Sequence, residues 1–363
     1  MDDNTPDDSD TSRRSFLKGM AVVAGGFALA GRVEPAFAST FAAAASRTSR
    51  APNWSGQIGL ELWTVRDMLA KDYVGTLEKV ARIGYKEVEP ATGYGDMSPK
   101  QFRALLDRLG LKSPSTHNGV TVGPDADVEK QLADFQIMGI EYASLDQPRR
   151  AGGQGGGRGR GGRPARTTPA STSPAAQREQ MAQFIRNTAQ PRTADDVKEE
   201  AARYNKFGKL AQKFGIKLLV HNHTVEFIPT KDTNELPYTI FLAETDPTLV
   251  VFQMDIGWAS VAGQNPIELF NQHPGRFVLW HVKDAACLKS LPPVPDQGGR
   301  MAAAQLVPVG LGDIDYGEIF KHADVAGMKH FQVEQDSAAD WGDSIAAARV
   351  SYEHLRTTLT TSA

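Results

Sequence analysis

Four short apolar segments in the second half of the chain each end in a residue that can bind a metal ion. The segments span 218–220, 250–254, 277–280 and 330–333, and the residues that follow them are His221, Asp255, His281 and Glu334. Short apolar, β-branched runs bounded by turn residues are typical of buried parallel strands. In a βα-barrel the carboxyl ends of the strands face one mouth, so these four residues could surround a single divalent ion.

The N-terminal segment has the pattern of an export signal. Residues 12–18 carry a twin arginine, a weakly apolar stretch follows at 19–30, and small residues at 36–38 offer a cleavage site. We predict a signal peptide over residues 1–38, with the twin-arginine translocation machinery as a partner and a periplasmic or otherwise exported product. A transmembrane anchor is the alternative, but the apolar stretch is short and charged residues follow it, so we expect no stable membrane insertion after cleavage.

Composition restricts the partners and the type of metal site. The net charge of −3 is too small to indicate a nucleic-acid or membrane partner. Cys287 is the only cysteine, which excludes an internal disulfide and a thiolate-rich metal site. A cofactor would therefore be one divalent ion held by histidines and carboxylates, and Mn, Zn, Co, Fe or Mg fits that donor set.

Strand and helix patterns alternate along the chain. After a flexible leader at 39–53, the first four strands are expected at 58–63, 86–89, 112–116 and 142–145, and the fifth from 216. The helices between them are expected at 76–83, 98–110, 127–138 and 195–214, and the last helix at 344–358. Eight such units predict a single-domain (β/α)₈ TIM barrel over residues 54–360. An open doubly wound sheet fits less well, because no Gly-rich dinucleotide fingerprint follows the first strand.

Residues 149–192 interrupt this alternation after the fourth strand. They are dominated by Gly, Arg, Pro, Ser, Thr and Ala, and the run at 152–163 cannot bury apolar surface, so we expect a disordered insertion. The run could be an RGG-like tract that binds nucleic acid, or a tolerated surface insertion. The export signal favours the second interpretation.

The fifth strand leads into a second group of candidate residues. Side chains alternate along a strand, so His221 and His223 point the same way, and Glu226 follows on the next loop. Two imidazoles and a carboxylate can act as ligand, orienting group and general acid or base. Alternatively, His223 could simply form a hydrogen bond to a neighbouring strand end.

Other strand ends add further polar and aromatic residues. Lys283 lies on the same side of its strand as His281 and could bind an oxyanion as a point charge. Several residues near the first three strand ends and after the sixth are candidates for binding substrate: Glu61, Trp63, Glu89, His117, Tyr94 and Trp258. The aromatic residues could stack on a sugar ring, or they could belong to the core.

Together, these segments resemble the xylose isomerase-like TIM-barrel superfamily, which includes sugar phosphate isomerases and epimerases. The resemblance runs from about Gln57 to Leu359, outside the insertion. Its most specific segments are 59–67, 83–89, 221–227, 281–284 and 310–315.

The resemblance implies a carbohydrate substrate and a metal-bound keto-sugar between two glutamate bases. Asp255, His281 and Glu334 match three of the family's four ligands, whereas His221 stands where the family has the other Glu. A neutral imidazole can bind the metal, but that base is lost, and Glu226 is the candidate replacement. This departure puts two-base epimerisation in doubt.

We therefore expect an exported, metal-dependent isomerase- or epimerase-like enzyme that removes a proton next to a carbonyl. Glu334 or Glu226 would move the proton, Lys283 and His117 would stabilise the oxyanion, and the substrate would be bound by Glu61, Trp63, Glu89, His223 and Trp258. A keto-glycoside lyase that uses β-elimination is a close alternative. A non-catalytic sugar-binding barrel and a nuclease are more distant ones.

Overall fold

The computed structural model describes residues 54–146, 191–294 and 296–361. The predicted signal peptide, the leader and the insertion as far as residue 190 lie outside these residues. Eight parallel strands form the main sheet: β1 (Gly59–Glu61), β2 (Glu87–Glu89), β3 (Ser115–Val120), β4 (Tyr142–Leu145), β5 (Lys217–His221), β6 (Val250–Asp255), β7 (Leu279–Val282) and β10 (His330–Val333).

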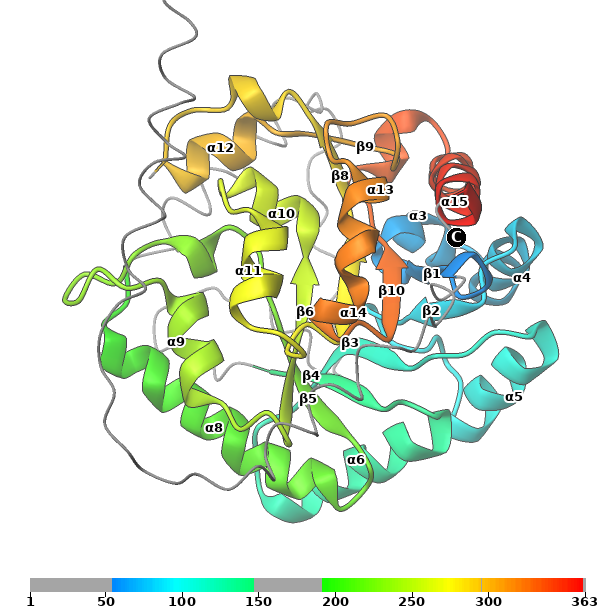
Figure 1. Ribbon diagram of the computed structural model, residues 1–363. Coiled ribbons are helices and arrows are strands. Elements are labelled where there is room, and N and C mark those ends of the chain that lie inside the picture. Colours follow the sequence, from blue (N-terminus) through cyan, green and yellow to red (C-terminus); the bar gives the residue numbers. More distant parts are fainter. Residues whose placement is uncertain (1–53, 147–190, 295, 362–363) are drawn as a thin grey trace, which may run out of the picture. The chain divides into compact units, whose positions relative to one another are not determined.

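Helices cover the outside of the sheet (Figure 1). They are α4 (Tyr73–Ile83), α5 (Pro99–Leu109), α6 (Asp125–Met138), α8 (Ala194–Gln212), α9 (Pro237–Glu244), α11 (Pro266–Gln272), α13 (Tyr316–Ile319), α14 (Ala323–Ala326) and α15 (Ser344–Thr361). Further elements lie in the segments after the strand ends: α3 (Arg66–Leu69), α10 (Ile256–Val261), α12 (Gln297–Ala303) and the antiparallel pair β8 (Asp284–Ala286) and β9 (Gln305–Val307). No helix in the described parts of the chain is long and apolar enough to cross a membrane.

The sheet closes into a barrel, which confirms the predicted fold. The strands follow the order β2-β1-β10-β7-β6-β5-β4-β3, and a bridge between Glu87 and Lys112 joins the two ends of that order. The Val88 amide donates to the Lys112 carbonyl at 2.8 Å in this bridge. An open doubly wound sheet is therefore excluded.

The third strand differs from its predicted range of 112–116. Pro114 has no N–H to donate to a ladder, and β3 begins only at Ser115. The strand then continues to Val120, so His117 lies within it, and its amide donates to the Pro90 carbonyl at 2.9 Å. His117 is thereby fixed to the end of β2.

Helix ends are set by local capping residues. Ser98 and Gln101 form a capping box at the start of α5, and Gly110, with φ +67°, ends that helix in the left-handed region, as the sequence predicts. Thr193 caps α8 in the same way through Asp196. The first helix begins earlier than its predicted residue 76, because the Asp72 side chain accepts the Gly75 amide at 2.9 Å.

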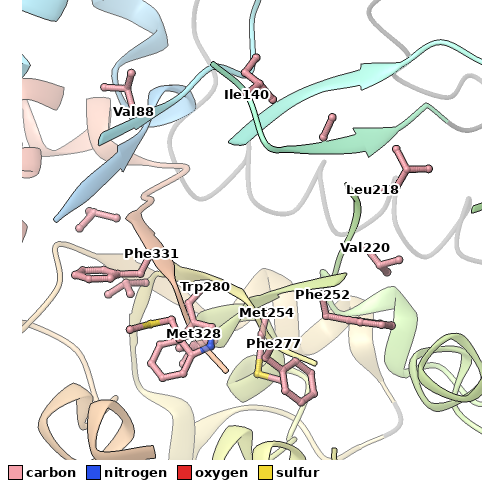
Figure 2. Packing of buried hydrophobic residues seen from close by; sticks show 14 of the residues in the cluster. Val88, Ile140, Leu218, Val220, Phe252, Met254, Phe277, Trp280, Met328 and Phe331 are labelled. Atoms are coloured by element: carbon pink, nitrogen blue, oxygen red, sulfur yellow. The ribbon is translucent and has the colours of Figure 1, made fainter. Parts of the chain in front are cut away.

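Alternate strand residues build two apolar layers. Val88, Leu218, Phe252 and Phe331 belong to a buried cluster that also includes apolar residues of the surrounding helices (Figure 2). The intervening positions form a smaller buried cluster: Tyr142, Leu219, Val251, Val278 and Leu279. Because side chains alternate, Leu219, Val251 and Leu279 share a face with His221, Asp255 and His281 further along the same strands. This smaller cluster is therefore an apolar floor beneath the polar strand ends.

Candidate active site

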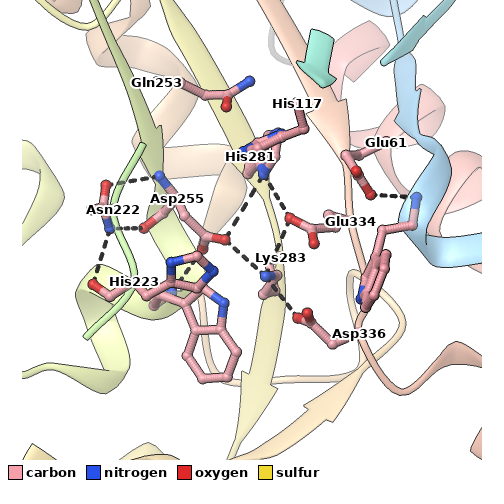
Figure 3. A network of polar contacts seen from close by, with 12 residues as sticks. Glu61, His117, Asn222, His223, Gln253, Asp255, His281, Lys283, Glu334 and Asp336 are labelled. Carbon is pink, nitrogen blue, oxygen red and sulfur yellow. Dashed lines mark hydrogen bonds and ion pairs between the residues drawn. The ribbon is translucent and has the colours of Figure 1, made fainter. Parts of the chain in front are cut away.

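The strand ends bring most of the predicted site residues into one network at the carboxyl end of the barrel, and Figure 3 shows part of this network. Six of its strands contribute carboxylates and imidazoles: Glu61 from β1, Glu89 from β2, His117 from β3, His221 from β5, Asp255 from β6 and His281 from β7. Lys283 and Glu334 directly follow β7 and β10. The shared orientation of parallel strands thus collects residues up to 273 positions apart, from Glu61 to Glu334.

Glu89 is a buried anion whose two oxygens are both engaged. One oxygen, Oε1, contacts His117 Nδ1 and lies 3.3 Å from His281 Nε2. The other, Oε2, accepts hydrogen bonds from the Ser115 hydroxyl and, at 2.7 Å, from the Gln253 amide. Burial alone would raise the pKa of Glu89, but the two histidines outweigh it and hold the pKa well below its ordinary value.

Lys283 lies fully buried among three carboxylates. Its Nζ is 2.8 Å from Asp255 Oδ2, 3.2 Å from Glu334 Oε2 and 2.7 Å from Asp336 Oδ2, and it lies 4.7 Å from the centroid of the Trp258 ring. Burial would lower the pKa of Lys283, but the carboxylates raise it well above its ordinary value. The side chain is therefore an ammonium whose charge is compensated within the protein.

His281 is the centre of the network. Its Nδ1 lies 2.6 Å from Glu334 Oε2 and 4.0 Å from Asp255 Oδ2, while its Nε2 faces Glu89. Burial opposes protonation, yet Glu334 and Glu89 raise the pKa of His281 well above its ordinary value. Burial alone would raise the pKa of Glu334. Lys283 and His281 outweigh it and hold this pKa well below its ordinary value.

Asn222 fixes the ends of β5 and β6 against each other. Its side chain accepts the Asp255 amide at 3.0 Å and donates to the Asp255 carbonyl at 3.1 Å. Asp255 in turn caps α10, because its Oδ1 accepts the Trp258 amide at 2.8 Å. Burial raises the pKa of Asp255 to about 6, although Lys283 opposes this shift.

Two groups of side chains are compact enough to hold a metal ion. They are Glu89, His117 and His281, and His221, Asp255 and His281, and within each group the potential ligand atoms lie within 4.8 Å of one another. His221 Nδ1 is buried and has no hydrogen-bond partner among the described residues, as expected for a metal ligand. Imidazole nitrogens and carboxylate oxygens suit Mn, Zn, Co, Fe or Mg, so these residues fit the predicted ion.

Glu226 stabilises the turn after β5. It lies in η3 (Val225–Phe227), and its Oε2 accepts the His223 amide at 2.6 Å. Burial raises the pKa of Glu226 from 4.5 to about 7. The His223 side chain is exposed, and its ring centroid lies 4.8 Å from that of His221. Glu226 is thus connected to the network through the backbone of His223.

The predicted aromatic residues have different surroundings. Trp63 is half-buried, and the Arg66 guanidinium lies 4.4 Å from its ring centroid. Trp258 is 4% exposed and packs against Lys283, so its ring is too buried to form a surface that a sugar could stack on. Glu61 accepts the Trp63 amide at 2.6 Å, and burial, followed by the charge of Glu334, raises the pKa of Glu61 well above its ordinary value.

The network includes four residues that sequence reasoning did not select: Ser115, Asn222, Gln253 and Asp336. Gln253 and Asp336 lie two positions from Asp255 and Glu334, so strand alternation could have placed them on the same side. Ser115 is likewise two positions before His117. Asn222 carried no such signal, because its role is to bind the backbone of a neighbouring strand.

Asp284 has a structural role beside the network. Its carboxylate accepts the amides of Gly310 at 2.9 Å, Gly312 at 3.1 Å and Ile314 at 3.3 Å. The glycine-rich loop at 309–316 therefore directs these amides at a carboxylate of the protein itself.

The comparisons with known proteins agree with this fold. A family model described as xylose isomerase-like TIM barrel matches residues 77–357. The chain is 26% identical over 159 residues to the inosose dehydratase of Lactiplantibacillus plantarum, covering 42% of this chain and 51% of the relative. It is 25% identical over 215 residues to the inosose dehydratase of Geobacillus kaustophilus, covering 57% and 60%. The matches thus span about half to three fifths of these relatives.

Solved structures show the same architecture at low sequence identity. A sugar phosphate isomerase/epimerase from Parabacteroides distasonis is 20% identical, with a TM-score of 0.59 and coverage of 86% of this chain and 96% of that one. A xylose isomerase-like TIM barrel protein from Mycobacterium smegmatis, solved in complex with magnesium, is 16% identical, with a TM-score of 0.55 and coverage of 86% and 99%. These similarities establish the fold.

Replacing Lys283 with Met should strongly destabilise the metal-free protein at neutral pH. The change leaves Asp255, Glu334 and Asp336 without their shared cation, and breaking a buried ion pair in this way costs about 3–5 kcal/mol. The loss should shrink as the pH falls, because the orphaned carboxylates become protonated. Urea denaturation at pH 7.5 and pH 5 measures both effects, with the exposed Lys71→Met as the control. Equal stability of the two variants at pH 7.5 would show that the ammonium is not needed.

Replacing Glu226 with Gln should change how stability depends on pH. The folded protein holds the Glu226 proton more tightly than the unfolded chain, since burial raises the pKa from 4.5 to about 7. This residue therefore makes the free energy of unfolding fall as the pH rises through that window. Glu226→Gln should gain stability relative to the wild type between pH 4.5 and pH 8 in parallel denaturation curves. The exposed Glu353→Gln should show no such gain, and a flat difference for Glu226→Gln would contradict the assignment.

Proposed function

The chain belongs to the xylose isomerase-like TIM barrel family, and from that membership we propose a metal-dependent enzyme that acts on a keto-sugar or keto-polyol. The reaction starts with removal of a proton from the carbon next to the ketone. A hydroxyl group, or a glycosidic oxygen, then leaves from the next carbon. The inosose dehydratases among the relatives support a carbohydrate substrate and an elimination.

The state of Glu334 is the observation that carries this proposal. Its Oε2 is engaged by His281 at 2.6 Å and Lys283 at 3.2 Å, whereas no contact within the described parts of the chain engages Oε1. These two cations keep the pKa of Glu334 low, so the carboxylate is ionised and can accept a proton on Oε1. Glu334 is therefore the general base.

Glu61 is the matching general acid. It lies beside Glu334 in Figure 3, and its pKa is raised by burial and by Glu334 itself, so it keeps its proton at neutral pH. Neighbouring carboxyl groups whose pKa values are pushed apart are suited to act as an acid and a base. The C–H proton moves to Glu334 and the C–O bond breaks. The leaving oxygen takes the Glu61 proton, so the net product from a free hydroxyl is water.

The ion would be held by His221, Asp255 and His281, with Glu334 next to it. When bound, a divalent ion would polarise the ketone and stabilise the enolate charge. Lys283 positions Asp255 and Glu334 through its ion pairs, and Asn222 holds Asp255 at the mouth.

Elimination is favoured over epimerisation by the donor set. An epimerase of the two-base type needs a second base across the substrate, and the chain has His221 at that position. Glu89 does not replace it, because both of its oxygens are occupied. Isomerisation shares the first proton transfer and differs only in where the proton returns.

Deuterium exchange tests the shared first step. The purified protein, supplied with Mn²⁺, should catalyse exchange of the proton next to the ketone of an inosose or a 3-keto-glycoside in D₂O, observed by NMR. Glu334→Gln should slow this exchange by about 10²–10⁴-fold because the base is lost, and Asp255→Asn should also reduce bound Mn²⁺. The exposed Glu318→Gln is the control. Unchanged exchange in both site variants would refute the mechanism, and loss of water distinguishes elimination from isomerisation.

We also propose that the enzyme is exported by the twin-arginine route. The support is the sequence alone, since residues 1–38 lie outside the described part of the chain. Expression in a bacterium with this pathway should yield periplasmic protein whose N-terminus is Ser39. Replacing Arg13 and Arg14 with Lys should retain it in the cytoplasm, and periplasmic export of that variant would overturn the assignment.

A further inference from the structure

We propose that Glu89 and His117 hold a second divalent cation beside the one assigned to His221 and Asp255, with His281 shared between the two. The first ion rests on the function proposed above. The second rests on a separate set of contacts at the ends of β2 and β3.

The groups around Glu89 Oε1 are placed as the ligands of one metal ion would be. Two imidazole nitrogens, His117 Nδ1 and His281 Nε2, converge on this one oxygen, and the three atoms lie within 4.8 Å of one another. Side chains that ligate one ion come this close, and an ion would replace the protons that these groups share. Glu89 and His281 are buried, whereas the His117 side chain is 22% exposed, so the group has an entry path for the ion from the mouth.

The remaining oxygen of Glu89 is held by other protein groups. Oε2 accepts from the Ser115 hydroxyl and from the Gln253 amide at 2.7 Å, which fixes the plane of the carboxylate and aims Oε1 at the histidines. Supporting contacts of this kind orient ligands at metal centres. The His117 amide is also bound to the Pro90 carbonyl, next to Glu89 in sequence.

His281 presents a different nitrogen to each group. Nε2 faces Glu89 at 3.3 Å, and Nδ1 faces Glu334 at 2.6 Å and Asp255 at 4.0 Å. One ring can therefore serve both ions, one on each nitrogen. The ring then loses its N–H proton to solvent, as ligands do when they bind metals.

Charge balance supports two ions. Four carboxylates surround the network, from Glu89, Asp255, Glu334 and Asp336, since Glu61 keeps its proton, and Lys283 is the only ammonium that contacts any of them in the described chain. With His281 deprotonated on both nitrogens and the other imidazoles neutral, the network carries four negative charges in excess, mostly buried. Uncompensated buried charge is strongly unfavourable, and two divalent cations supply the matching positive charge. One ion leaves half of it uncompensated.

The test is the stoichiometry of bound metal in the full chain without its signal. After equilibration with Mn²⁺ or Zn²⁺ and desalting, elemental analysis should find two ions in the wild type. Glu89→Gln and His117→Gln should each retain one ion, and so should Asp255→Asn. The Mn²⁺ electron paramagnetic resonance spectrum should change from that of a coupled pair in the wild type to that of a single ion in each variant.

Glu87→Gln is the matched control. Glu87 is a buried carboxylate on the same strand, two residues before Glu89, but it pairs with His330 at 2.9 Å at the other end of the barrel. It should retain two ions, and circular dichroism checks that every variant is folded.

The outcomes separate the second site from the proposed function. A single ion in the wild type, lost in Asp255→Asn and kept in Glu89→Gln, would overturn the second site alone, as would two ions kept in Glu89→Gln and His117→Gln. A single ion lost in Glu89→Gln and kept in Asp255→Asn would support the Glu89 group and count against the ligands of the proposed function. No bound ion in the wild type would overturn both.

Discussion

The arrangement of the site depends on one buried ammonium. Lys283 follows β7 and contacts Asp255 at the end of β6 together with Glu334 and Asp336 after β10, so it connects three neighbouring strands at the mouth. Without this cation, three carboxylates within reach of one point would repel one another in a region of low dielectric. The backbone is built around it as well. A Cβ on Gly257 would lie 2.5 Å from the Lys283 carbonyl oxygen, so glycine is needed there.

The same ammonium keeps Glu334 ionised and so contributes to the different protonation of two neighbouring glutamates. Lys283 and His281 hold the pKa of Glu334 low, so this carboxylate stays ionised. Burial, followed by the charge of Glu334, raises the pKa of Glu61, although His281 opposes this shift. Two glutamates at adjacent strand ends thereby differ in protonation because of burial and of their charged neighbours. An acid and a base at one mouth follow from this difference, and the proposed ion would add the stabilisation of negative charge on the substrate oxygen.

The barrel could be predicted because its signals are local. Each apolar run is a strand, each capped amphipathic run is a helix, and the chemistry falls at strand ends that parallel pairing must bring together. The pairing of side chains across the mouth could not be predicted in this way. Gln253 donates to Glu89, which lies 164 positions away in the sequence. Whether Lys283 can reach Asp336 depends on strand tilt and side-chain length. The start of β3 differed because one proline removed a donor from the expected strand.

The distribution of cations argues for an uncharged substrate. At the mouth, the charge of Lys283 is compensated by carboxylates, and the amides of the glycine-rich loop donate hydrogen bonds to Asp284. Neither group is therefore available to bind a phosphate. Lys86, Lys112 and Lys329 lie at the opposite end of the barrel, where they line a pocket of about 640 Å³ that contains none of the predicted site residues. A phosphorylated sugar would meet an excess of negative charge at the site until metal ions were bound. A neutral keto-polyol would meet carboxylates able to accept hydrogen bonds from its hydroxyl groups, which is the recognition that these strand ends provide.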